Sequence, residues 1–306
     1  DTINGSSVDN DTLLGGQGND VLGVADVGPG RRSGLFTLHD TPTGLSGGGD
    51  DFINGNFGDD FIYGGAGNDT IFGEDGRDEI YDSGGRNLID GGPGSDFIKV
   101  SGHNTITGGI GDDVVTMVSG SFVVDLGEGN DACLGLFEGG DARATVSGGA
   151  GDDFVRGNNG ADSISGGAGN DLIVGWGGAD TVSGGEGSDE FGFFGGQTTT
   201  VFENIDIILD WNREDFFYFQ DLQTGDAVGP GAGINYVEAF APTYEAALAI
   251  ANGHIAGKVI NYVVVQVGAD LYVFADARVD DGVADAAVRL VGRTLADIDF
   301  ANFLTG

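Results

Sequence analysis

Large apolar residues recur every nine positions through much of residues 1–192, and small or polar residues separate them. In residues 55–99 each nine-residue unit opens with a glycine-rich segment of six residues that ends in Asp, or once in Asn. Three residues follow, and the middle one is large and apolar. Such a segment predicts a short strand with one inward side chain, and glycine provides the φ > 0 geometry of the turn before it. The pattern therefore predicts short strands joined by tight turns.

Two units would complete one coil, so turns on the same edge should lie eighteen residues apart. A second regular block, residues 148–192, repeats the pattern of the first block, residues 46–99. The aspartates that we expect to lie one above the other are Asp51 and Asp69, Asp60 and Asp78, Asp78 and Asp96, Asp153 and Asp171, Asp162 and Asp180, and Asp171 and Asp189. The inward apolar series expected in the second block is Val155, Ile164, Ile173, Val182 and Phe191.

Two stretches depart from the regular pattern. Residues 28–45 break the period, and an insertion in a repeat array maps to a surface loop. Residues 100–147 are degenerate, and Ala144 stands there in an Asp position. The residues that keep the acid and apolar positions are Asn104 with Ile106, Asp113 with Val115, and Asp131 with Cys133. The other residues expected to point inward are Val123, Val124 and Val146. We expect this stretch to continue the same repeat structure, so that residues 1–192 form one domain.

Residues 193–306 lose the glycine period and form the second expected domain. Alternating or apolar runs predict strands at residues 216–219, 262–267, 271–275 and 287–291. Residues 243–253 predict a short helix with Thr243 as the N-cap and Gly253 just past the end. The last stretch, residues 295–304, is weakly helical in pattern.

The chain is strongly acidic, because 49 Asp and Glu residues against 12 Lys and Arg residues give a net charge of −37. Nucleic acids and anionic membrane surfaces are bound through basic patches, so the charge argues against both as partners. The 61 glycines keep the nine-residue period, which indicates a structural role instead of disorder. Cys133 is the only cysteine, so no intrachain disulfide exists. No apolar run of about eighteen residues predicts a membrane-spanning helix.

The run of residues 55–99 resembles the nonapeptide G-G-x-G-x-D-x-U-x of RTX (repeats-in-toxin) proteins, where U is a large aliphatic residue. The resemblance implies an all-β fold, a right-handed parallel β-roll that binds Ca²⁺ in its turns. Residues 206–215, 271–276 and 288–292, before residues 299–303, look like the serralysin-like C-terminal cap and secretion region of RTX proteins exported by type I systems. The resemblance therefore implies a capping domain, rich in β-strands and with a short helix, over residues 193–306.

Aspartate at a fixed turn position adds a hard anionic oxygen, and Ca²⁺ takes about six to eight oxygen ligands. A calcium ion between stacked turns would cancel the repulsion between their carboxylates. Ala144 predicts a turn without an ion. The predicted ligands are Asp11, Asp20, Asp51, Asp60, Asp69, Asp78, Asn87, Asp96, Asp113, Asp131, Asp153, Asp162, Asp171, Asp180 and Asp189.

These features favour an extracellular, calcium-dependent structural protein that folds after export and assembles with copies of itself on a bacterial surface. A surface layer, matrix or filament would fit, and the resemblance implies a Gram-negative source. A cell-surface polysaccharide is a further possible partner, and we expect no membrane insertion. No catalytic activity is expected, because no H-E-x-x-H motif is present and the G-x-S-x-G sequence around Ser46 falls inside the repeat phase.

Two alternatives stay open. The chain could be the export half of a secreted enzyme, such as a protease, lipase or epimerase, with a catalytic domain before Asp1. It could also be an adhesin or carbohydrate-binding module that uses Trp176 and Trp211. The acidic residues 276–285 are either a solvated turn or one extra calcium site.

Overall fold

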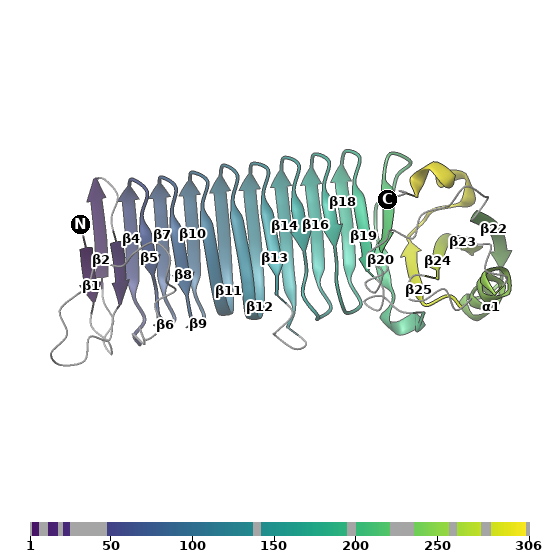
Figure 1. Cartoon of the computed structure of the whole chain (residues 1–306), viewed down its shortest axis with the longest axis horizontal. Helices are drawn as coiled ribbons and strands as arrows, with labels where there is room; N and C mark the ends of the chain where they lie inside the picture. The colour runs from purple at the N-terminus through teal and green to yellow at the C-terminus, as the bar shows by residue number, and fades with distance from the viewer. Residues whose placement is uncertain are drawn as a thin grey trace. The chain divides into compact units, whose positions relative to one another are not determined.

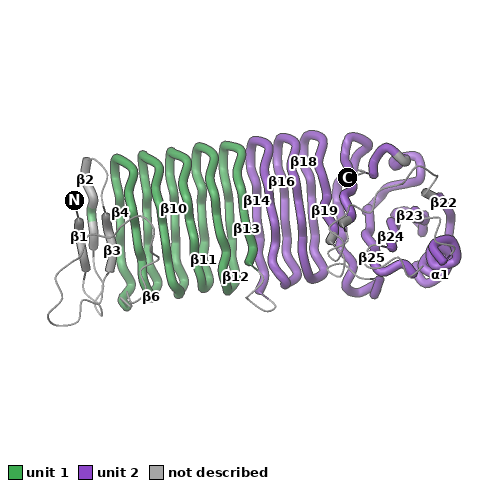
Figure 2. The backbone as a smooth tube through the Cα atoms, in the orientation of Figure 1, with its two compact units in different colours: residues 1–139 green, residues 140–306 purple. Residues whose placement is uncertain are grey.

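The computed structural model describes residues 2–5, 12–17, 21–24, 48–136, 142–194, 200–220, 236–256, 262–276 and 283–303. The chain is mostly β-structure, a parallel β-solenoid with one short α-helix near the C-terminus (Figure 1). This confirms the predicted fold class. Two compact units, residues 1–139 and residues 140–306, are coloured separately in Figure 2. The domain boundary predicted at residue 192 stays a prediction.

The first unit consists of parallel strands, most of them short. They are β1 (Thr2–Gly5), β2 (Thr12–Gln17), β3 (Val21–Val24), β4 (Phe52–Phe57), β5 (Phe61–Tyr63), β6 (Ala66–Gly67), β7 (Thr70–Asp75), β8 (Glu79–Asp82), β9 (Gly84–Gly85), β10 (Leu88–Pro93), β11 (Phe97–Ile110), β12 (Val114–Glu128) and β13 (Ala132–Gly135). Strands β2, β4, β7 and β10 pair in one wall, and β3, β5 and β8 pair in the other. Strands β11 and β12 are long enough to belong to both walls.

Two ladders of apolar side chains fill the space between these walls. Ile53, Ile71 and Ile89 follow one another in register on one wall. Ile62, Ile80, Ile98, Val115 and Cys133 do so on the other wall. All eight side chains are fully buried. Burial of an aliphatic side chain of this size stabilises the folded state by about 1.5–3 kcal/mol. The central apolar residue of each nonapeptide is therefore the core.

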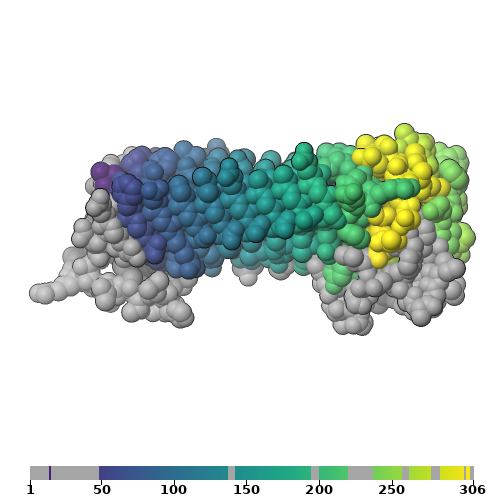
Figure 3. All heavy atoms as spheres, turned by 90° about the horizontal axis from the view of Figure 1, so that it is seen from above, coloured from purple at the N-terminus to yellow at the C-terminus, as the bar shows by residue number. Residues whose placement is uncertain are grey.

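Glycines hold adjacent turns of the first unit at backbone contact distance. Gly76 has φ +150°, and a Cβ there would overlap the carbonyl oxygen of Gly58 in the preceding coil. Gly94 repeats this contact against Gly76 one coil later. In the space-filling view the coils of this unit lie directly against one another (Figure 3). The repeat therefore requires glycine at this position for spacing as well as for backbone conformation.

The second unit begins with the same kind of coil and ends with different elements. Its strands are β14 (Ala144–Ala150), β15 (Phe154–Arg156), β16 (Ser163–Ala168), β17 (Leu172–Val174), β18 (Thr181–Glu186), β19 (Glu190–Phe194), β20 (Asp206–Ile208), β21 (Phe216–Gln220), β22 (Tyr236–Ala241), β23 (Tyr262–Val267), β24 (Asp270–Ala275) and β25 (Ala286–Leu290). Its helices are α1 (Tyr244–Ile255) and the 3-10 turns η1 (Phe202–Asn204), η2 (Leu295–Asp297) and η3 (Phe300–Asn302).

The parallel ladder of the second unit passes into a mixed sheet, in which β22 pairs parallel with β23. Val146, Ile164, Val182 and Ile208 are in register and buried, and so are Val155, Ile173, Phe191 and Phe217. This confirms the predicted inward series. Strand β25 pairs parallel with β20 and antiparallel with β24, which pairs antiparallel with β23. Strand β25 thus covers the edge of β20 and ends the parallel stacking.

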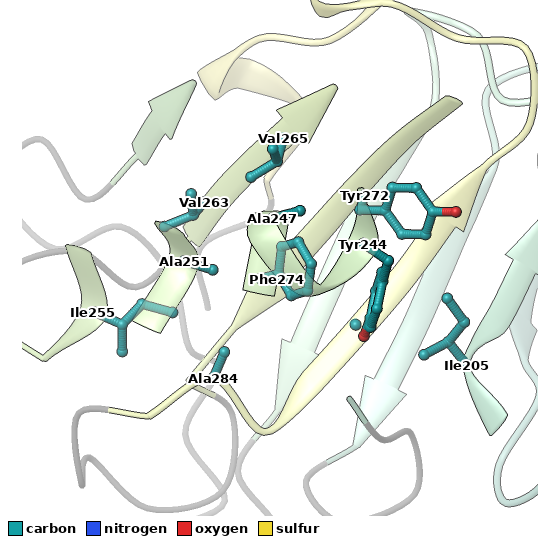
Figure 4. Close-up of a cluster of buried hydrophobic side chains, with 11 residues drawn as sticks. Ile205, Tyr244, Ala247, Ala251, Ile255, Val263, Val265, Tyr272, Phe274 and Ala284 are labelled. Atoms are coloured by element: carbon teal, nitrogen blue, oxygen red, sulfur yellow. The ribbon is translucent and has the colours of Figure 1, made fainter. Parts of the chain in front are cut away.

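Helix α1 packs on this sheet through a small hydrophobic cluster. Its Tyr244, Ala247, Ala251 and Ile255 lie against Val263, Val265, Tyr272 and Phe274 of β23 and β24 (Figure 4). Thr243 is the N-cap, as predicted, and its Oγ1 accepts a hydrogen bond from the Ala246 N–H at 3.3 Å. The predicted end at Gly253 is wrong: the helix continues to Ile255, because burial of Ile255 in this cluster stabilises the extra residues.

One inward prediction in the degenerate stretch is also wrong. Val124 and Val146 are buried, but Val123 is 54 % exposed. Successive side chains of a strand point to opposite faces, so Val123 and Val124 cannot both face the interior. The predicted insertion at residues 28–45 and Ser46 lie outside the described residues.

The glycine contacts predict a difference between two matched substitutions. Gly76 and Gly84 have nearly equal φ values of +150° and +156°, but a Cβ at Gly84 would meet nothing within 4 Å. We expect Gly76→Ala to lower the free energy of unfolding by about 1–3 kcal/mol more than Gly84→Ala does, because only the first overlaps backbone. Urea unfolding in saturating calcium measures the difference. Equal losses in the two variants would contradict the close-contact explanation.

Candidate metal centres

Each regular turn places one carboxylate beneath the turn of the preceding coil. The backbone N–H of Asp51 donates a hydrogen bond to Asp69 Oδ1 at 2.8 Å, and the N–H of Asp60 donates to Asp78 Oδ1 at 2.8 Å. The same bond joins Asp78 to Asp96, Asp153 to Asp171, Asp162 to Asp180 and Asp171 to Asp189. All six pairs predicted to stack are therefore confirmed. We call this set of bonds the aspartate ladder.

The ladder uses one oxygen of each carboxylate and leaves the other at a glycine. The Oδ2 atoms of Asp78, Asp96, Asp171 and several others are buried without a hydrogen-bond partner among the described residues. A Cβ at Gly73 would overlap Asp78 Oδ2 and would lie 2.5 Å from the Gly91 carbonyl oxygen. Gly91 and Gly166 have the same two kinds of neighbour. A carboxylate oxygen and a carbonyl oxygen thus converge on a space that any larger residue would fill.

The predicted ligands that the structure describes are all buried, with at most 4 % of each residue exposed. They are Asp51, Asp60, Asp69, Asp78, Asn87, Asp96, Asp113, Asp131, Asp153, Asp162, Asp171, Asp180 and Asp189. Asp11, Asp20 and part of the acidic stretch, residues 277–282, lie outside the described residues. The position of the described residues in the ladder is established, and their role as calcium ligands stays a prediction.

Several of the described turns differ from the rest. Asp162 Oδ2 accepts a hydrogen bond from the Asn158 N–H at 2.7 Å, so this oxygen is less available to an ion. Ala144 is buried and donates its N–H to Asp162 Oδ1 at 2.7 Å, but it offers no carboxylate. Asn87 Oδ1 accepts the Asp69 N–H at 2.8 Å and so keeps the ladder with an amide.

Sequence reasoning missed two residues that continue the ladder in the second unit. Asp206 Oδ1 accepts the Asp180 N–H at 2.9 Å, and Asp215 Oδ1 accepts the Asp189 N–H at 3.2 Å. Their spacing is 26 residues instead of 18, so the nine-residue period cannot locate them. The signal that remained is local: Asp206 and Asp215 each stand two residues before a buried apolar side chain, Ile208 or Phe217.

Burial raises the pKa of the ladder carboxylates. Desolvation is the largest cause for Asp69, Asp78 and Asp180, whose pKa values rise to about 6, about 7 and about 9. Hydrogen bonds from the backbone lower these values, and neighbouring carboxylates such as Asp206 beside Asp180 raise them. In a folded chain without a bound cation, these carboxyl groups therefore stay protonated at pH values at which an ordinary aspartate is ionised.

The two tryptophans named in the carbohydrate-binding alternative lie in different environments. Trp211 is fully buried and stacks on Phe217 with ring centroids 4.1 Å apart, so its predicted role in sugar binding is wrong. Trp176 lies in a pocket of about 160 Å³ with Phe154, Tyr218 and Arg156. The Arg156 guanidinium carbon is 5.6 Å from the Trp176 ring centroid. The role of Trp176 stays a prediction.

The donor set of the turns fits a hard divalent cation. Among the residues that the structure describes, no three His, Cys, Asp or Glu side chains form a metal-binding group. An ion in the turns would therefore take ligands from carboxylates and from main-chain carbonyls together, and Ca²⁺ accepts such mixed oxygen sets. Bound there, it would neutralise the carboxylates and join successive coils.

A parallel solenoid with one buried carboxylate in most of its turns defines a calcium-binding repeat protein. The family model of the RTX calcium-binding nonapeptide repeat (4 copies) matches residues 1–22, 45–80, 72–99, 100–116, 138–173 and 156–191. The chain thus contains RTX nonapeptide repeats, and such repeats bind Ca²⁺ at multiple sites. No curated protein matches the chain. In the part of the chain that the structure describes, no helix has the length and apolar character to cross a membrane.

The ladder predicts unequal effects of two isosteric substitutions. Asp78→Asn replaces the buried Oδ2 by an amide nitrogen, so we expect fewer bound calcium ions and a higher calcium concentration at the midpoint of folding. Asp59→Asn makes the same charge change at an exposed position, whose Oδ1 accepts the Arg77 N–H at 3.0 Å. Calorimetric titration with calcium compares the two. If both variants bound as many ions as the parent chain, Asp78 would not be a ligand.

The raised pKa values predict how pH affects the calcium-free chain. A carboxyl group whose pKa is raised above 3.8 by folding stabilises the fold fully at pH values below 3.8. This stabilisation is lost as the pH rises through the folded pKa values of about 6 to 9. In excess chelator we therefore expect greater resistance to urea at about pH 4 than at about pH 8. In saturating calcium the order should reverse, because protons compete with the ion for carboxylates. A chelated chain that is more stable at the higher pH would contradict this.

Proposed function

We propose that this chain is an extracellular, calcium-dependent structural protein that folds on Ca²⁺ binding after export and assembles with copies of itself on a bacterial surface. It would act as a surface-layer, matrix or filament component, and the proposal includes no catalytic role. The observation that carries the proposal is the aspartate ladder, because buried carboxylates stacked coil upon coil require a neutralising cation.

Calcium concentration then determines where the chain folds. Extracellular calcium modules work at roughly 0.1–1 mM, far above cytosolic levels. At low calcium the net charge of −37 and the buried carboxylates both oppose the compact state. An ion that binds only the folded chain stabilises it in proportion to RT ln(1 + [Ca²⁺]/Kd) for each site. The unfolded chain is therefore the form that would be exported, and it would fold outside.

The C-terminal elements support a capping role for residues 193–306, which we include in the proposal. Strand β25 covers the edge of β20, and Phe303 forms a β-bridge with Phe217 of β21. One edge of the last parallel coil in this unit is thus paired with a strand of the same chain, and the other is contacted by a single bridge residue. Occupied edges stop uncontrolled strand pairing at one end of a repeat array.

Self-assembly is supported by a column of alternating apolar and threonine side chains on the outer surface of the first unit, which we call the apolar column. Phe52, Thr70, Leu88, Thr105 and Val123 follow one another in register on one wall and point away from the core. Phe52, Leu88 and Val123 are 39 %, 46 % and 54 % exposed. An exposed apolar strip on a regular sheet is suited to contact with the same strip of a second copy. Calcium would first reduce the repulsion between the two acidic copies.

This proposal predicts ordered polymers that require calcium. Purified protein in millimolar calcium should form sheets or filaments in electron micrographs, and excess EGTA should dissolve them. Leu88→Lys should raise the protein concentration at which polymers form, because it places charge in the apolar column, and should leave calcium-induced circular dichroism unchanged.

The control for this variant is His103→Lys, which adds a charge at an exposed position outside the column. We expect it to assemble like the parent chain. Monodisperse particles of the parent chain in millimolar calcium, at every concentration tested, would overturn the assembly proposal and leave calcium-dependent folding intact.

A further inference from the structure

The turn formed by residues 82–87 carries its acid at the opposite end from its neighbours. Residues 64–69, the preceding turn on the same edge, begin with Gly64 and end with Asp69. Residues 82–87 begin with Asp82 and end with Asn87. The nine-residue pattern selects Asn87 as a ligand here and overlooks Asp82.

Asn87 accepts the backbone hydrogen bond that an aspartate accepts in the other turns, but it supplies no carboxylate. Its Oδ1 accepts the Asp69 N–H at 2.8 Å, so the aspartate ladder is unbroken. Its Nδ2 donates to Asp82 Oδ1 at 2.6 Å, and the Gly84 N–H donates to the same oxygen at 2.9 Å. An amide NH₂ group is a donor and cannot bind a cation. The anionic oxygen that the missing carboxylate would supply therefore has to come from another residue.

Asp82 provides that carboxylate and directs it into the preceding turn. The residue is only 5 % exposed, and its Oδ2 has no hydrogen-bond partner among the described residues. A Cβ at Gly64 would lie 2.5 Å from Asp82 Oδ2 and 3.1 Å from Asp69 Oδ2. Asp69 is 1 % exposed, and its Oδ2 likewise has no such partner. Two buried carboxylate oxygens thus converge on Gly64, where neighbouring turns bring one carboxylate and one carbonyl together.

Two like charges in a buried space require either a shared proton or a cation. Oxygen donors with a combined charge of −2 match a hard divalent ion. We propose that Asp82 and Asp69 together bind a calcium ion, and that Asp82 takes over the ligand role that the repeat pattern gives to Asn87. The site rests on the calcium binding of the RTX repeats. It differs from its neighbours because two side-chain carboxylates face the ion, where the neighbouring turns supply one carboxylate and one main-chain carbonyl.

The test is the number of calcium ions bound by the chelator-stripped full chain, measured by calorimetric titration with CaCl₂. Asp82→Asn should lower that number by one. The control Asp90→Asn removes a charge from the same coil at a half-buried position of β10 and should keep the number of the parent chain. An unchanged number in the Asp82→Asn variant, with equal affinities, would overturn the proposal.

A double variant keeps the test informative if Asp82→Asn folds poorly. Asp82→Gly with Asn87→Asp rewrites residues 82–87 in the pattern of residues 64–69, and it should fold in calcium and restore the full number of ions. A double variant that folds but binds one ion fewer than the parent chain would contradict the proposed exchange of roles. Loss of ions in the Asp78→Asn variant alone would support calcium binding by the repeats and exclude this particular site.

Terbium gives a local readout of the same site. Tyr63 and Tyr81 are in register, and they directly precede Gly64 and Asp82 in the sequence. We expect tyrosine-sensitised emission to fall in the Asp82→Asn variant and to stay at the parent level in the Asp90→Asn variant. Equal emission from all three chains would count against an ion between Asp69 and Asp82.

Discussion

The burial of negative charge in regular layers is the constraint on which the rest of this structure depends. Most ladder aspartates donate their N–H to the carboxylate of the next coil, so backbone and side chain together set the spacing of the coils. The same geometry leaves a second oxygen on each of several of these residues without a donor. A fold built in this way is stable only when something positive occupies the turns, because desolvated carboxylates resist ionisation.

The glycines and the aspartate of the repeat together allow close contact between successive turns. Glycine at the first turn position leaves space in which a carboxylate oxygen and a carbonyl oxygen approach each other. Glycine at the fourth position lets the backbone of one coil touch the carbonyl of the coil before it. Exchange of the acid between the two ends of residues 82–87 keeps a carboxylate in this space while Asn87 preserves the ladder. The turn therefore requires a carboxylate at a given place in space, and a residue at a different position of the nonapeptide, such as Asp82, can supply it.

The regular part of the fold could be predicted from the sequence because its contacts are periodic. A nine-residue phase places Asp60 on Asp78 and Ile62 on Ile80 without further information. Where the spacing changes, the prediction loses its basis: Asp96 and Asp113 are 17 residues apart, and Asp189 and Asp215 are 26 apart. The carbohydrate-binding alternative requires an accessible Trp211, whereas packing against Phe191 and Phe217 buries it. Local pattern fixes which face a residue takes, but a unique tertiary contact leaves no periodic signal.

The most direct measurement of the central claim is far-ultraviolet circular dichroism of the calcium-free chain during a calcium titration at neutral pH. The account predicts a largely disordered spectrum in excess EGTA and a cooperative rise of β-signal as free calcium approaches millimolar concentration. An unchanged β-spectrum in EGTA and in calcium would contradict it, because the stacked carboxylates would then be stable without a cation.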